Sequence, residues 1–177
     1  SGLKWATCNV GASSPEDYGD YFAWGETETK TEYTQDNNLT SGLTISELQS
    51  QGIIDGSGNL TPSYDAATAN WGGSWRMPTK EELAELNIKC TWTWTTQNGV
   101  NGYKVTGPNG NHIFLPAAGY RSGSSWLNDA GEGGYYWSST PYESHSFRAY
   151  RLMLGSGGHS MDWRNRYYGL SVRPVSE

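Results

Sequence analysis

The sequence predicts an α+β domain built from many short strands and two or three short helices. Nine Trp and twelve Tyr supply much of the hydrophobic bulk, and 23 Gly are available for turns. Aromatic residues with frequent turn residues favour short strands over a helical bundle. The length of 177 residues is enough for a real core. We therefore expect one domain over residues 1–177.

The clearest helix signal follows Pro78, which disfavours a helix running through it from the N-terminal side. Thr79 and Glu82 have the spacing of a capping box, in which each side chain accepts a hydrogen bond from the backbone amide of the other residue. Apolar residues at helical spacing come next. The pattern predicts a helix from about Thr79 to Ile88.

Two tryptophans precede this helix. Trp71 and Trp75 flank Gly72-Gly73, and glycines let the backbone approach other segments closely. A buried indole needs such close packing. We therefore predict that Trp71 and Trp75 are core anchors.

The N-terminal third shows weaker signals for two strands and two helices. A second capping box, formed by Thr44 and Glu47, predicts a short helix, and an alanine-rich run predicts another. A polar run rich in Thr, Glu, Asn and Asp predicts a surface loop. In chain order the predictions are strands at 3–10 and 21–24, a loop over 26–44, and helices at 44–51 and 65–70.

After residue 90 the pattern changes to the period of strands. Trp92 and Trp94 alternate with threonines, and turn residues follow at 97–99 and 108–111. Three antiparallel strands joined by these turns form a predicted meander that ends at Leu115. Further strands are predicted at 133–140, 147–154, 160–163 and 169–175.

The distribution of charged and of apolar residues argues against two classes of partner, nucleic acids and membranes. The net charge is −6, and residues 1–65 hold ten acidic but only two basic side chains. A nucleic-acid partner needs clustered Lys and Arg in excess, and no Lys follows Lys104. No run approaches the roughly 20 apolar residues of a membrane span. We expect neither nucleic-acid binding nor direct membrane insertion by this domain.

Residues that commonly carry chemistry are few and scattered. Cys8 and Cys90 match no metal-ligand spacing, which leaves a disulfide and two separate buried thiols as alternatives. His112, His145 and His159 lie on three different segments, and none belongs to a Ser-His-Asp arrangement. The sequence also has no phosphate-loop motif. We predict no catalytic residue, no metal ligand and no cofactor.

Five motifs together resemble a known family. They span nearly the whole chain and are Trp5–Gly11, Trp75–Thr79, Ile113–Gly119, Tyr136–Thr140 and Ser171–Val175. The chain resembles the Fibrobacter succinogenes major paralogous domain, a family of the C-type-lectin-like superfold. The resemblance implies that the first and last strands pair. It also implies export to a bacterial cell surface of the Bacteroidetes type, as an outer-membrane lipoprotein or a pilus-associated protein.

The resemblance also defines the alternatives that involve chemistry. Formylglycine-generating enzymes share the superfold and a similar Trp-Arg-x-Pro-Thr run, but they need a reactive cysteine pair late in the chain, and no Cys follows Cys90. Sugar-binding C-type lectins use a calcium site of spaced Glu, Asn and Asp with a Pro, and the sequence has no clear copy of it. We therefore predict a protein that is not an enzyme and has no calcium site.

The segment 135–168 has the composition of a recognition surface. It is rich in Tyr and Trp and contains four Arg but no Lys. Tyr and Arg give large contact area and directional hydrogen bonds at low cost in entropy. Strand alternation predicts one set of side chains that point inward. This inward set is Tyr150, Leu152, Leu154, Met161 and Trp163.

The outward set and the turn residues beside it form the predicted binding face. An ordinary solvated face is the alternative interpretation. The predicted ligand-contacting residues are Tyr142, Glu143, His145, Arg151, Met153, Ser160, Asp162, Arg164 and Asn165.

These observations give a functional hypothesis. The C-terminal segment resembles the variable region of proteins diversified by retroelements, in which Tyr, Ser, Asn, Asp, His and Arg are scattered over a fixed lectin-like frame. We expect an adhesin-like domain that binds a protein or glycan on a host or neighbouring cell. The alternative is a structural module of a larger surface or pilus protein without a ligand of its own.

Overall fold

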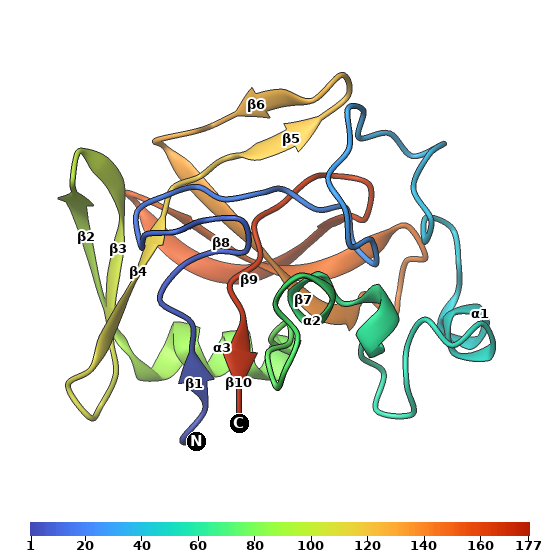
Figure 1. Cartoon of the computed structure of the whole chain (residues 1–177), viewed down its shortest axis with the longest axis horizontal. Helices are drawn as coiled ribbons and strands as arrows, with labels where there is room; N and C mark the ends of the chain where they lie inside the picture. Colours follow the sequence, from blue (N-terminus) through green and yellow to red (C-terminus); the bar gives the residue numbers. More distant parts are fainter.

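Short antiparallel strands and three short α-helices make up the computed structural model, which describes residues 1–177 (Figure 1). The α+β class predicted from the sequence is therefore confirmed. In chain order the elements are β1 (Lys4–Trp5), α1 (Ile45–Ser50), a 3₁₀ helix (Pro62–Tyr64), α2 (Ala66–Trp71), α3 (Lys80–Lys89), β2 (Thr91–Gln97), β3 (Val100–Thr106), β4 (His112–Pro116), β5 (Tyr120–Ser122), β6 (Trp126–Asn128), β7 (Gly133–Pro141), β8 (Arg148–Gly155), β9 (Gly158–Asn165) and β10 (Val175–Ser176).

The two ends of the chain lie side by side, as predicted (Figure 1). β1 and β10 pair antiparallel, with Trp5 opposite Val175. Both strands are shorter than predicted, because the rest of each segment makes only isolated hydrogen bonds to the other. The Val10 amide, for example, donates to the Val172 carbonyl over 3.0 Å. The ends are therefore joined by an interrupted ladder.

Both predicted capping boxes are present. Thr44 caps α1 with Glu47, and Thr79 caps α3 with Glu82. The predicted helix at 65–70 is α2, and the Asp65 carboxylate caps it by accepting hydrogen bonds from the second and third amides of the helix. The helix positions were predictable because each depends on residues close together in the sequence.

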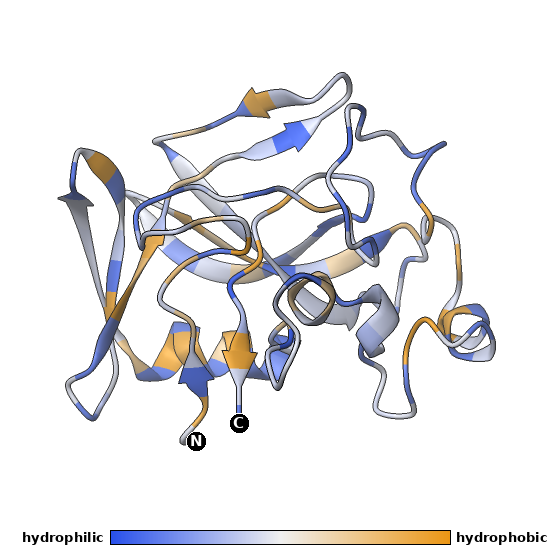
Figure 2. Cartoon of the chain, in the orientation of Figure 1, coloured by the Kyte–Doolittle hydropathy of each residue, from blue (hydrophilic) through white to orange (hydrophobic).

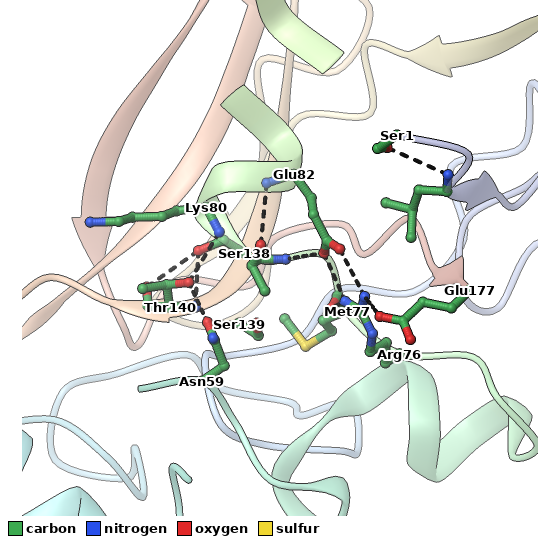
Figure 3. A network of polar contacts seen from close by, with 12 residues as sticks. Ser1, Asn59, Arg76, Met77, Lys80, Glu82, Ser138, Ser139, Thr140 and Glu177 are labelled. Carbon is green, nitrogen blue, oxygen red and sulfur yellow. Dashed lines mark hydrogen bonds and ion pairs between the residues drawn. The ribbon is translucent and has the colours of Figure 1, made fainter. Parts of the chain in front are cut away.

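A polar network fixes the start of α3 (Figure 3). Arg76 donates to both carboxylate oxygens of Glu82, over 2.7 and 2.8 Å, and to Glu177 over 3.0 Å. Burial alone would raise the pKa of Glu82, but the hydrogen bonds from Arg76 and Thr79 outweigh it and lower that pKa. The network ties the helix start to the C-terminal residue of the chain.

Two three-stranded antiparallel sheets and one hairpin complete the fold. β2, β3 and β4 form the predicted meander, and β7, β8 and β9 form the second sheet. The β5–β6 hairpin, at the top of Figure 1, was not predicted, because strands of three residues are too short to show a period.

The core consists of two main clusters. One surrounds Trp24 and Trp137, and the other lies between α3, β3 and the β7–β9 sheet. In Figure 2, α3 carries both hydrophobic and hydrophilic turns, as expected for a helix with one buried face. Leu83 and Leu86 are on that face.

The prediction that Trp71 and Trp75 anchor the core holds only in part, because Trp71 packs against the cluster around Trp24 whereas Trp75 belongs to no core cluster. Both are only half-buried and meet edge to face, with ring centroids 5.4 Å apart. Trp24 and Trp137 are the fully buried indoles, and each donates its ring N–H to a backbone carbonyl, over 2.9 and 2.8 Å. Gly72 and Gly73 both have positive φ, so the loop between Trp71 and Trp75 is a surface turn.

The alternative of a disulfide does not hold in this structure. Cys8 and Cys90 are free thiols, and both are half-buried. Cys90 packs against the cluster under α3, so the alternative of two separate thiols holds, although neither thiol is fully buried.

We predict that Trp137→Ala lowers the free energy of unfolding by about 3–5 kcal/mol, because it removes a fully buried ring and its hydrogen bond. Trp75→Ala, the matched control, should cost less than about 2 kcal/mol. Urea unfolding of both variants measures the difference. Equal losses would contradict the placement of the core.

Candidate functional site

The nine predicted site residues divide between the two faces and one end of the β7–β9 sheet. Tyr150 pairs with Trp163, and Arg151 with Asp162, so the two pairs project from opposite faces. The turn between β7 and β8 contains Tyr142, Glu143 and His145. On the face away from α3 lie Arg151, Met153, Ser160, Asp162 and Arg164, and Asn165 is half-buried at the end of β9.

Three rings meet on the α3 side of this sheet, and we call Tyr142, Tyr150 and Trp163 the aromatic cluster. Tyr142 packs edge to face on Tyr150, with centroids 5.2 Å apart, and stacks at 29° on Trp163, with centroids 5.7 Å apart. Such contacts stabilise ring pairs beyond the area they bury. The cluster is therefore ordered by its own packing.

Two cations lie over these rings. The Arg148 guanidinium is 3.9 Å from the centre of Trp163, and the Lys80 ammonium is 4.4 Å from the centre of Tyr150. Both distances suit cation–π attraction. The backbone of Lys80 is fixed near this sheet, because its N–H donates to the Thr140 hydroxyl at the end of β7 over 3.0 Å (Figure 3).

An acidic side chain completes the surroundings of the cluster. The Tyr150 hydroxyl donates to Glu143, 2.9 Å from each oxygen. Burial, reinforced by this hydrogen bond, raises the pKa of Tyr150 to about 12. A hydrogen bond from its own backbone, the bond from Tyr150 and the charge of Lys80 lower the pKa of Glu143. Near neutral pH the pair is a phenol and a carboxylate.

Trp163 was predicted to point inward and be buried, but it is 37 % exposed. The face was assigned correctly. Met161, on the same face, packs in the cluster under α3, whereas Trp163 belongs to neither main core cluster. The helix therefore covers the middle of β9 and leaves Trp163 accessible.

Arg151 was predicted to be exposed, and this is wrong. It is only 7 % exposed and donates to Asp162, with Nε 2.8 Å from Oδ1. Its guanidinium also lies 4.5 Å from the centre of the Tyr135 ring. Alternation gave the correct face, but it could not show that distant segments cover that face.

The cover over this second face is also aromatic. Tyr120 of β5 contacts Tyr135 edge to face and stacks almost parallel on Tyr168, with centroids 5.4 and 5.5 Å away. The Arg164 guanidinium lies 4.7 Å from the centre of Tyr168. The charged side chains on this side, Arg151, Asp162 and Arg164, are therefore engaged within the chain.

The remaining predicted residues are more accessible. Glu143 and His145 are exposed in the turn, Ser160 is exposed and Met153 is half-buried. Met153 and Ser160 line a hollow of about 430 Å³ near the β8–β9 hairpin. Sequence reasoning missed Lys80 and Arg148 as partners of the aromatic cluster. The position of Lys80 over Tyr150 depends on contacts between distant segments and gives no signal in the sequence.

Other chemistry is sparse in the structure. No group of three or more His, Cys, Asp or Glu side chains is arranged to hold a metal ion. His159 stacks on Trp92 with centroids 4.0 Å apart, and burial lowers the pKa of His159. The longest helix, α3, has ten residues, and none of the helices could span a membrane.

Comparison with known proteins gives one match. Residues 79–175, more than half of the chain, match the model of a family described as a domain of unknown function (DUF8237). The chain belongs to this family. The match begins at the N-cap of α3 and includes β2 to β9, so it contains the aromatic cluster. No curated protein and no solved structure matches the chain.

We predict that Arg151→Ser lowers the free energy of unfolding by about 1–3 kcal/mol, because it removes a buried, hydrogen-bonded charge. Arg164→Ser should lower it by only about 0.5–1 kcal/mol, the usual contribution of a cation–π contact at a more accessible site. Urea midpoints at an unchanged slope give both values. If Arg151→Ser is as mild as the control, Arg151 is not buried.

Proposed function

We propose that this chain is a non-enzymatic, adhesin-like binding domain of a bacterial cell-surface protein, and that it recognises a protein or glycan through the aromatic cluster. One observation carries the proposal. Trp163 is 37 % exposed beside two packed tyrosines, and cations and a carboxylate lie around the three rings.

An ordered aromatic surface of this kind favours binding. A large ring that is already ordered loses little conformational entropy when a partner covers it. Arg148 and Glu143 add hydrogen-bonding groups beside the ring, and Trp, Tyr and Arg are the residue types most enriched among binding hot spots. The cluster therefore combines contact area with directional contacts.

The aromatic cluster is a better candidate than the opposite face of the sheet. Arg151 is only 7 % exposed and ion-paired with Asp162, whereas Trp163 is 37 % exposed despite its own contacts within the chain. Arg164 is stacked on Tyr168. Among the predicted site residues we therefore assign Tyr142 and Glu143 to direct contact, and we add Trp163 and Arg148.

We propose further that the fold is C-type-lectin-like and related to the Fibrobacter succinogenes major paralogous domain. The paired ends of the chain and the motifs Trp75–Thr79 and Ser171–Val175 support this proposal. On the same basis we infer export and a place at the cell surface, as an outer-membrane lipoprotein or a pilus-associated protein. We also propose that the C-terminal segment is a hypervariable region, as its resemblance to retroelement-diversified proteins implies.

The test begins with a partner found on a glycan array or by pull-down of surface proteins. Trp163→Ser should weaken that interaction about 30-fold or more, the effect of losing a binding hot spot. Trp126→Ser is the matched control, because Trp126 is 73 % exposed on the separate β5–β6 hairpin. Undiminished binding by a folded Trp163→Ser variant would exclude the aromatic cluster. The absence of any partner would favour a purely structural module.

A further inference from the structure

One outer strand of the meander has an uncovered edge. β4 is covered at Phe114, whose carbonyl accepts a hydrogen bond from Arg173, and β7 is covered by Ser171, which bonds to Tyr135 and Trp137. β2 pairs with β3 only. Its seven residues run without a bulge, so they present a straight edge.

The backbone groups on this edge follow from the turn that ends the strand. Asn98 and Gly99 have φ of 49° and 79°, which is typical of a two-residue type I′ hairpin. In this turn Gln97 and Val100 form a hydrogen-bonded pair, and the pattern then alternates. The N–H and C=O groups of Trp92, Trp94 and Thr96 therefore point away from β3. None of them bonds to another group of the chain.

β2 also lacks the features that usually protect such an edge. Native edge strands are commonly blocked by charged side chains, Pro or bulges. β9, the other long outer strand, carries Asp162 and Arg164. The sequence of β2 is TWTWTTQ, which has no charge, no Pro and no Gly. An uncharged, β-prone edge of this length favours pairing with another strand.

A second copy of the same strand fits this edge. When two β2 strands run antiparallel about a two-fold axis at Trp94, Trp92 of each copy faces Thr96 of the other. Every outward residue then faces an outward residue, which gives two hydrogen bonds in each of three pairs. β2 itself has no charge, and Gln97, which holds the Glu16 carboxylate at the end of the strand, faces the uncharged Thr91 of the other copy. We propose that the protein forms a homodimer through β2, which joins two meanders into one continuous sheet.

The side chains allow a specific test. In this arrangement Thr93 of one copy lies opposite Thr95 of the other, in a pair whose side chains approach closely. Thr93 is exposed, Thr95 is half-buried, and Lys104 of β3 lies opposite Thr93 within the chain. Thr93→Glu is therefore compatible with the folded monomer, and the charge chosen at position 95 decides whether two copies attract or repel.

Three proteins are compared by sedimentation velocity over a range of concentrations. The parent should show a reversible monomer–dimer equilibrium. Thr93→Glu with Thr95→Glu should weaken the dimer at least tenfold, because acidic groups face each other twice. Thr93→Glu with Thr95→Lys should restore dimerisation, because both cross-strand pairs become complementary. Circular dichroism and thermal melts verify that each variant is folded.

Each result decides the proposal. A parent that is monomeric at all concentrations overturns it, as does a dimer that the double-Glu variant leaves unchanged. Failure of the Glu/Lys variant to recover, while folded, overturns the two-fold register at Trp94. Recovery supports the second copy over any other strand, because only a copy carries the matching charges.

Discussion

The fold depends on a buried guanidinium. Arg173 is 1 % exposed and has no carboxylate partner, so burial lowers its pKa. It donates instead to the Asn9 side chain over 2.8 Å and to the Ala6 and Phe114 carbonyls over 3.2 and 2.8 Å. These acceptors belong to the N-terminal segment and to β4. One side chain of the C-terminal segment therefore joins its own segment to two distant parts of the chain, and a charge buried this way needs all its hydrogen bonds.

Loop hydrogen bonds and a second buried guanidinium also hold the fold together. Of 91 backbone hydrogen bonds, 49 lie outside the helices and strand pairs, so loops carry much of the frame. Arg166 is fully buried and donates to the carbonyls of Thr40, Leu43 and Arg148. These bonds hold the loop over 26–44 against the start of β8. Burial lowers the pKa of Arg166 to about 10. Such bonds fix the frame from inside, and Trp163 at its edge does not take part in either main core cluster.

Sequence reasoning succeeded where structure is local and failed where it is not. The capping boxes at Thr44 and Thr79 and the strand alternation around Trp92 each depend on a few neighbouring residues. The burial of Arg151 and the exposure of Trp163 depend on which distant segments cover each face of one sheet. The same holds for Trp24 and Trp137, which the sequence does not distinguish from the other seven tryptophans. The period of a strand predicts the face on which a side chain lies, but it does not predict which segments cover that face.

The most direct test of this account is amide hydrogen exchange on Arg173→Gln under native conditions. If the guanidinium holds the frame, protection should fall together in β4 and at Ala6, Val10 and Val175, whose amides donate to backbone carbonyls, although only Val175 lies near the substitution. Such coupling is expected when one buried group satisfies several segments. Parent-like protection at Ala6 and throughout β4, with loss confined to the residues next to 173, would contradict the central role of Arg173.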